Sequence, residues 1–143
     1  MRARFVEGSW FAGQAGPFDL IVSNPPYIPH ADIQTLDRDV RAFDPLLALD
    51  GGADGLAAYR ALAPSLAGAL QGDGLALVEI GIRQADAVSE ILRGAGLAVL
   101  PPIPDLAGIP RVLAAAPPGA KAFLTLKKRL ECGARIANDR AGQ

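Results

Sequence analysis

The sequence FDLIVSNPPY occupies residues 18–27 and joins a short apolar run to two consecutive prolines. The run 18–22 is typical of a strand that is buried on both faces of a sheet. Proline fixes φ, lacks a backbone N–H and keeps the preceding residue out of the helical region. Asn24-Pro25-Pro26-Tyr27, the NPPY turn, is therefore predicted to be stiff and extended, which suits a site that positions a substrate.

Short apolar runs and helical patterns alternate through the rest of the chain, which favours an α/β domain with a largely parallel sheet. In such sheets ligands bind at the carboxyl ends of the strands, so Asn24 and Glu79 are expected at the same edge. Residues 29–53 are polar and irregular. The predicted strands are 2–6, 18–22, 75–80, 97–100 and 110–115, and the predicted helices are 56–70 and about 84–94, with Asp54 as a cap and a kink or break at Pro64.

Composition excludes several classes of protein. The chain has 143 residues, half of them apolar, which suits one domain with a sizeable core. One cysteine and one histidine leave no basis for an internal disulfide, a zinc site or a His-based triad, and no metal is expected. No apolar run reaches the length of a membrane span, so a soluble cytoplasmic protein is expected.

The C-terminal segment differs from the rest in charge. From Lys121 onward there are six basic and two acidic residues, a net of +4, against a formal charge of −1 for the whole chain. Phe123, Leu126 and Leu130 have helical spacing and predict a short amphipathic helix. We therefore expect residues 117–143 to be an atypical basic tail, with its charges on a solvated face.

The NPPY turn offers two acceptors to an amino group whose lone pair is delocalised. The Asn24 side-chain oxygen and the Pro25 carbonyl can accept from its two N–H groups, turn its lone pair toward an electrophilic methyl and stabilise the developing charge. Tyr27 supplies an apolar wall and a favourable face for a sulfonium cation. The alternative is an ordinary strand-to-loop turn, although the tetrapeptide arises by chance at a rate on the order of 10⁻³ or less in such a chain.

Several stretches besides SNPPYI at 23–28 resemble the protein-(glutamine-N5) methyltransferases that modify peptide chain release factors, the HemK/PrmC family. The resemblance covers roughly residues 2–116. NPPY alone would also fit DNA adenine and rRNA guanine methyltransferases, but the long stretch at 40–62 favours the glutamine family. The stretches are GSWF at 8–11, FDLIVSNPPYIP at 18–29, VRAFDPLLALDGGADGLAAYRAL at 40–62, LALVEIGIRQADAV at 75–88 and DLAGIPRVL at 105–113.

The resemblance implies a class I S-adenosylmethionine-dependent methyltransferase with a Rossmann-like sheet, of which residues 1–116 form the C-terminal part. It implies transfer of a methyl group to a glutamine amide of a release factor, with no direct nucleic-acid or membrane partner. Asn24, Pro25, Pro26 and Tyr27 would hold the amide, with Asn24, Pro25 and Tyr27 as the catalytic residues. Asn24 and Trp10 would contact S-adenosylmethionine, although Trp10 is equally well read as a core aromatic residue.

Other polar residues of the resembling stretches have simpler expected roles. Glu79 is expected to hydrogen-bond structural backbone at the end of a central strand. Tyr59 and Arg60 are expected to be packing and surface residues, and His30 a solvated loop residue.

The sequence also departs from the family. The family's N-terminal helical domain, its first βαβ unit and the Gly-rich cofactor loop have no counterpart here, and no GxGxG occurs. The first two strands of the family's sheet would then be missing beside strand 18–22, exposing that strand's edge. We expect this chain alone to bind S-adenosylmethionine weakly or not at all, and to be inactive or weakly active.

Two other readings stay open. A nucleic-acid amino-methyltransferase would need a basic face near Asn24, yet residues 29–55 hold six aspartates against Arg38 and Arg41. A non-catalytic remnant is supported by the missing cofactor loop.

Overall fold

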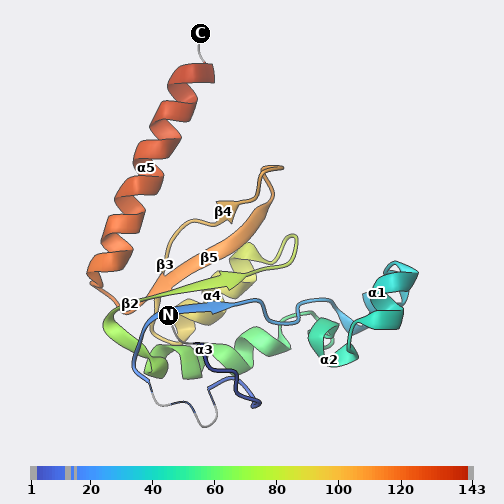
Figure 1. Ribbon diagram of the computed structural model, residues 1–143. Helices are drawn as coiled ribbons and strands as arrows, with labels where there is room; N and C mark the ends of the chain where they lie inside the picture. Colours follow the sequence, from blue (N-terminus) through green and yellow to red (C-terminus); the bar gives the residue numbers. More distant parts are fainter. Residues whose placement is uncertain (1–2, 12–13, 15, 142–143) are drawn as a thin grey trace.

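The computed structural model describes residues 3–11, 14 and 16–141, and the side chains of residues 132–141 are not described. The expectations that concern residue 2 and the side chains of Cys132, Arg135, Asp139 and Arg140 lie outside the described residues. The α/β class is confirmed, with a partial mixed sheet and helices on both of its faces (Figure 1).

The sheet has the order β1-β2-β5-β3, and β4 also pairs with β5. β1 and β2 are parallel, with Leu20 opposite Leu75 and Val22 opposite Leu77. β5 runs antiparallel to β2, β3 and β4. The bounds are β1 (Phe18–Ser23), β2 (Leu70–Glu79), β3 (Ala98–Val99), β4 (Ile103–Pro104) and β5 (Pro110–Ala116).

The expectation of a largely parallel sheet is wrong, because β1–β2 is the only parallel pair among the strands of the described residues. The reason is the short loop 105–109 between β4 and β5, in which the Asp105 carboxylate accepts from the backbone N–H groups of Ala107 and Ile109. A loop this short can only join antiparallel strands, because a parallel pair needs a crossover of a dozen or more residues.

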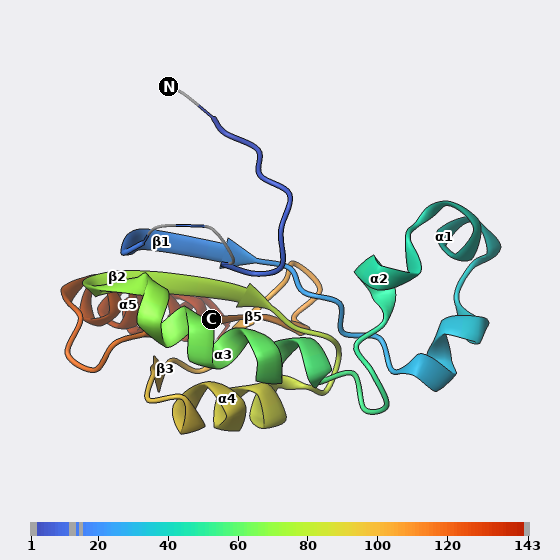
Figure 2. The same cartoon turned by 90° about the horizontal axis from the view of Figure 1, so that it is seen from below.

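Of the three long helices, two cover one face of the sheet and the third covers part of the other face, as Figure 2 shows. α3 and α4 lie on the first face, and α5 on the second. Three shorter helices lie between β1 and α3, where an irregular segment was expected. The helices are the 3-10 helix His30–Thr35, α1 (Arg38–Phe43), α2 (Leu46–Leu49), α3 (Ala57–Ala69), α4 (Ala85–Gly94) and α5 (Lys121–Ala141).

Alternation along β2 builds the two layers of the core. Ala76 and Val78 are fully buried and belong to the cluster that contains the α3 and α4 side chains. Leu75 and Leu77 point to the opposite face and pack against the cluster that contains Phe123 of α5. Because successive side chains of a strand point to opposite faces, this alternation places helices on both sides of β2.

β1 is less buried than its sequence predicts. Ile21 is in the core, but the side chains of Leu20 and Val22 are 56% and 71% exposed. The two exposed side chains are opposite Leu75 and Leu77 and so share the face that α5 covers, but α5 contacts β2 and β5 and leaves β1 open. The expectation that this strand is buried on both faces is wrong, and β1 is an edge strand within the described residues.

Three other expectations about secondary structure are corrected or extended. Residues 3–6 form no strand and are exposed. α3 continues through Pro64 without a break, because Pro64 lies on the exposed side, where the carbonyl left without a donor can be hydrated. The predicted tail helix is confirmed and extends to Ala141, with Phe123 buried and Leu126 and Leu130 packed beside it.

Candidate functional site

The NPPY turn follows β1 directly and lines one side of a small cavity. Asn24 is exposed, Pro25 is buried, and Pro26 and Tyr27 are half-buried. All four residues line a cavity of about 130 Å³, together with Ile28, Ala48 and Leu49. The structure therefore brings together the four residues that the sequence predicts to hold an amide. Their role in catalysis stays a prediction.

The opposite wall of this cavity comes from α2 and is fastened to the turn by backbone hydrogen bonds. The Ile28 N–H donates to the Leu49 carbonyl at 3.1 Å, and the Gly51 N–H donates to the Ile28 carbonyl at 2.8 Å. The His30 N–H donates to the Gly52 carbonyl at 2.9 Å. These bonds fix how far α2 lies from the NPPY turn, and so they set the width of the cavity.

Tyr27 connects the turn to the end of β2. Its hydroxyl donates to Oε1 of Glu79 over 3.3 Å, so the carboxyl ends of β1 and β2 do meet at one edge, as expected. Burial raises the pKa of Tyr27, the negative charge of Glu79 raises it further, and Arg111 opposes both. The expectation that the Glu79 side chain bonds backbone is wrong for the described residues, in which it accepts from Tyr27.

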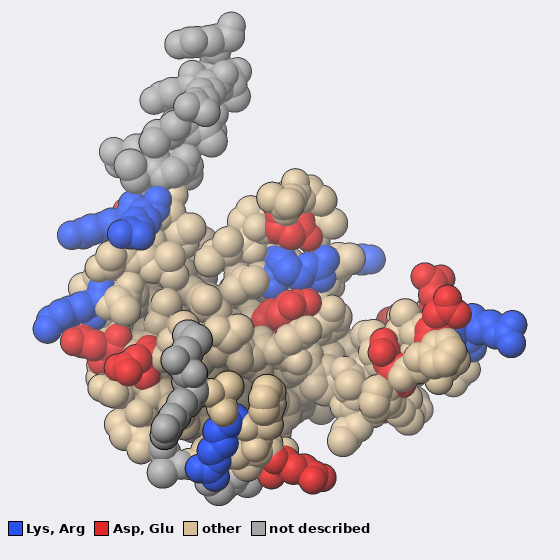
Figure 3. Space-filling model, in the orientation of Figure 1, with Lys and Arg blue, Asp and Glu red and all other residues tan. Residues whose placement is uncertain are grey.

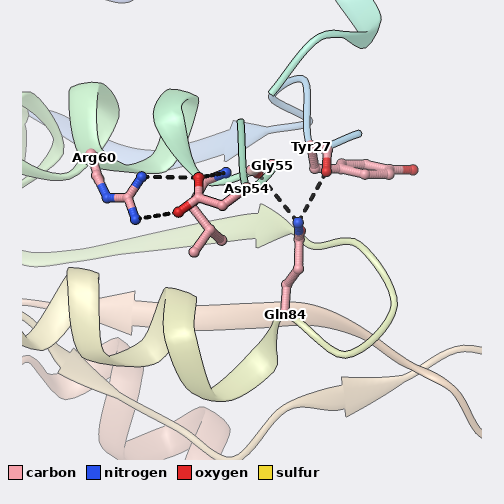
Figure 4. Close-up of polar contacts among 6 residues, drawn as sticks. Tyr27, Asp54, Gly55, Arg60 and Gln84 are labelled. Atoms are coloured by element: carbon pink, nitrogen blue, oxygen red, sulfur yellow. Dashed lines mark hydrogen bonds and ion pairs between the residues drawn. The ribbon is translucent and has the colours of Figure 1, made fainter. Parts of the chain in front are cut away.

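Gln84, at the start of α4, also contacts the turn, although no sequence motif pointed to it. Its Nε2 donates to the Tyr27 carbonyl at 3.0 Å and to the Gly55 carbonyl at 3.3 Å (Figure 4). Its Oε1 accepts from the Gly81 N–H at 3.0 Å. The sequence does place Gln84 as a polar residue shortly after a predicted strand. Its hydrogen-bond partners, however, depend on the path of the loop 51–55.

The remaining polar residues behave largely as expected. Tyr59 is buried, and its hydroxyl donates to the Glu79 carbonyl at 3.0 Å. Arg60 is a surface residue that pairs with Asp54, at 2.6 Å and 3.0 Å (Figure 4). Asp54 also accepts from the Leu56 N–H, but α3 has Leu56 as its N-cap and no side-chain cap there, so the expectation that Asp54 caps this helix is wrong. His30 is mostly exposed and lies 2.7 Å from Asp50.

Trp10 is not brought to the NPPY cavity. It is 40% exposed, has a φ of 50° and is not among the residues that line the cavity. The structure also does not bury it in the core, so neither the cofactor-binding role nor the core role of Trp10 gains support.

A second, wider cavity of about 540 Å³ adjoins Tyr27. Its lining includes both acidic and basic side chains, among them Asp32, Asp54, Arg83 and Arg111. Arg111 lies 3.5 Å from Asp105 and donates to the Ile80 carbonyl, so part of its charge is already compensated. This cavity is lined by charges of both signs.

Surface charge near the site is also mixed. In Figure 3, the segment that contains α1 and α2 shows mostly acidic side chains, with basic ones at its outer edge. Within the part of the chain that the structure describes, no three His, Cys, Asp or Glu side chains are grouped closely enough to hold a metal ion. None of the described helices combines the length and the apolar character needed to cross a membrane.

Curated relatives are similar in sequence to most of this chain. A release factor glutamine methyltransferase of Bradyrhizobium diazoefficiens is 54% identical over 115 residues, which is 80% of this chain and 39% of the relative. Those of Rhodospirillum rubrum and Caulobacter vibrioides are 52% and 49% identical and are covered to 35% and 39%. The chain thus spans less than half the length of these relatives. The resemblance found in the sequence is confirmed.

Two further comparisons add little to the evidence from these relatives. The crystal structure of a protein-(glutamine-N5) methyltransferase from Alicyclobacillus acidocaldarius aligns with a TM-score of 0.46 and 32% identity, covering 76% of this chain and 54% of that one. No protein-family model matches the sequence.

Proposed function

The chain is homologous over about 80% of its length to release factor glutamine methyltransferases, and from this we propose that it supplies the substrate-positioning part of such an enzyme. The proposed substrate is the side-chain amide of a glutamine in a peptide chain release factor. In the net reaction, a methyl group replaces one proton of the amide nitrogen. The observation that carries the proposal is that all four residues of the NPPY turn line one cavity beside a rigidly held backbone.

The cavity suits an amide side chain. The turn offers the Asn24 side-chain oxygen and the Pro25 carbonyl as acceptors for the two amide N–H groups. Hydrogen bonds to both N–H groups orient the nitrogen and favour the positive charge that develops on it during transfer. Because prolines and backbone hydrogen bonds hold these acceptors, little reorganisation is needed when the substrate binds.

S-adenosylmethionine is the proposed cofactor, and when bound it supplies an electrophilic methyl group on a sulfonium sulfur. The cavity of about 130 Å³ is smaller than the roughly 300–1,000 Å³ of typical small-molecule sites. Its residues therefore fit an amide and do not fit the whole cofactor. The adjoining cavity of about 540 Å³ is large enough, but no GxGxG cofactor loop occurs in this sequence. We propose that this chain alone binds S-adenosylmethionine weakly or not at all, which isothermal titration tests. Micromolar binding by this chain would refute it.

A methyltransferase acting on nucleic acid is less well supported. Such an enzyme needs a positive surface to follow the phosphate backbone. The segment that contains α1 and α2 instead shows mostly acidic side chains, with basic ones at its outer edge (Figure 3).

The proposal is tested by a methyl-transfer assay with S-adenosylmethionine and purified bacterial release factor. The chain is assayed alone and after mixing with the upstream part of the Bradyrhizobium relative, which this chain does not cover. We expect transfer to the release factor in the mixture and little or none with either part alone. A single-stranded oligonucleotide as substrate tests the nucleic-acid reading. A mixture that forms a complex but transfers no methyl group would favour a non-catalytic remnant.

A further inference from the structure

The side-chain amide of Gln84 has four partners from four segments of the chain. Besides the Tyr27 and Gly55 carbonyls and the Gly81 N–H, its Oε1 lies 3.4 Å from the Tyr59 hydroxyl, whose single proton is shared with the closer Glu79 carbonyl at 3.0 Å. A glutamine side chain has two N–H donors and one oxygen with two lone pairs. Both donors and one lone pair have a partner of their own, and the second lone pair has the shared contact with Tyr59, in a half-buried position.

The space around Gln84 depends on two glycines. A Cβ on Gly55 would lie 2.5 Å from the Tyr27 carbonyl oxygen and 2.6 Å from Nε2 of Gln84. A Cβ on Gly81 would lie 2.7 Å from Oε1 of Gln84. Any side chain at these positions would push the amide away from the turn, so the close approach is built into the backbone on both sides of Gln84.

The oxygen and the nitrogen of the Gln84 amide bind different parts of the chain. The oxygen bonds the Gly81 N–H, directly beyond β2, and so fixes the amide to the sheet edge. The nitrogen holds the Tyr27 carbonyl, two residues after Pro25, and the Gly55 carbonyl (Figure 4). Because the two prolines make the NPPY turn stiff, fixing its end at Tyr27 also fixes the direction of the Pro25 carbonyl.

We infer that Gln84 is a positioning residue, which holds the NPPY turn against the end of β2 so that its two acceptors face the substrate amide. The inference rests on the proposed function. Gln84 lines the wider cavity beside Tyr27 and not the 130 Å³ cavity, so we place its action on the amide through the turn.

The test uses two substitutions of Gln84 in the full chain. Gln84→Met removes all four hydrogen bonds at similar volume. Gln84→Glu keeps the acceptors for Gly81 and Tyr59 but, when ionised, lacks the donors for the Tyr27 and Gly55 carbonyls. Gln34 is exposed and supplies the matched controls Gln34→Met and Gln34→Glu.

The first readout is independent of activity and measures the position of the turn by nuclear magnetic resonance. Exchange of the Gly81 amide hydrogen is expected to accelerate about tenfold or more in Gln84→Met and to stay near the wild-type rate in Gln84→Glu, because local opening sets the rate of exchange. The Tyr27 carbonyl carbon shift is expected to change in both variants. If that shift is unchanged in both, Gln84 does not hold the turn, whether or not the chain takes part in methyl transfer.

The second readout uses the mixture in which the wild-type chain transfers methyl groups. Both Gln84 variants are expected to lower kcat about 10- to 100-fold, because a small misplacement of a positioning group costs that much. The KM for the release factor is expected to stay within about twofold, and the Gln34 controls to match the wild type. A moved turn with an unchanged kcat would overturn the positioning role. No transfer by the wild-type chain would refute the proposed function, while the first readout still decides whether Gln84 holds the turn.

Discussion

The Tyr27 hydroxyl lies 3.3 Å from the carboxylate of Glu79 and donates a hydrogen bond to it. The two residues are far apart in the sequence, and this bond joins the NPPY turn after β1 to the last residue of β2. Since β1 and β2 are the parallel pair of the sheet, their carboxyl ends meet at one edge. The contact therefore places the turn at the edge where α/β sheets bind their ligands.

Glu79→Gln is expected to lower the pKa of Tyr27. In the native chain, burial and the charge of Glu79 both raise this pKa, and the glutamine keeps an acceptor oxygen but removes the charge. The measurement is a spectrophotometric tyrosinate titration in a Tyr59→Phe background, in which Tyr27 is the only tyrosine left. Glu90→Gln, on the exposed face of α4, is the control. An unchanged Tyr27 pKa in Glu79→Gln would show that the two side chains are not in contact.

Gly55→Ala is expected to destabilise the fold, whereas Gly68→Ala is expected to stabilise it. Gly55 has a φ of +74° and its new Cβ would lie 2.5 Å from the Tyr27 carbonyl oxygen, which together cost about 2 kcal/mol or more. Gly68 lies in α3 with nothing near its Cβ position, so alanine there adds about 0.5–1 kcal/mol of stability. Urea denaturation measures both. Equal effects would contradict the close approach of Gly55 to the turn.

Asp54→Asn is expected to flatten the dependence of stability on acidic pH. Hydrogen bonds from Arg60 and from the Leu56 backbone hold the pKa of Asp54 at about 2, below its ordinary value of 3.8. A carboxyl group with a lowered pKa in the folded state stabilises the fold above its ordinary pKa and loses this contribution as the pH falls through its folded value. Denaturation curves between pH 5 and about pH 2 compare the variant with the wild type.

The control for Asp54→Asn is a substitution of Arg60, which pairs with Asp54. Arg60→Gln is expected to flatten the same curve, and the double variant to add little, because both substitutions remove one interaction. Additive effects of the two would mean that the ion pair does not form in solution. The pair is about half exposed, so its effect should weaken as salt is added.

Leu66→Ala is expected to lower the free energy of unfolding by about 2–5 kcal/mol. Leu66 of α3 is fully buried among the side chains of β2 and α4, and its truncation leaves a cavity. Leu106→Ala is the matched control, since Leu106 is fully exposed and its truncation should change stability by less than about 0.5 kcal/mol. A small effect at Leu66 would contradict the packing of α3 on the sheet.

Local sequence signals predicted the elements that carry the site. The apolar run at 18–22, the paired prolines and the helical spacing around Tyr59 and Leu66 each fix a local conformation with few alternatives. The sequence also placed Asn24 and Glu79 at one edge, because that follows from two parallel strands joined by a helix.

The parts that the sequence analysis missed depend on distant contacts. The direction of β5 follows from a tight loop stabilised by Asp105, whose side-chain bonds do not appear in an apolar pattern. The exposure of Val22 depends on how far α5 extends over the face of the sheet that the two share. Gln84 gains its role because the loop with Gly55 returns to the turn, which no local propensity encodes.

The central claim is that the NPPY turn holds a glutamine amide of a release factor for methyl transfer. Mass spectrometry of the release factor, after incubation with S-adenosylmethionine, the chain and the upstream part of the Bradyrhizobium relative, tests it most directly. We expect one added methyl group on a glutamine side-chain nitrogen, and loss of this product when Asn24→Ala replaces the wild-type chain. Methylation that persists at the wild-type rate with Asn24→Ala, or that falls on another kind of residue, would contradict it.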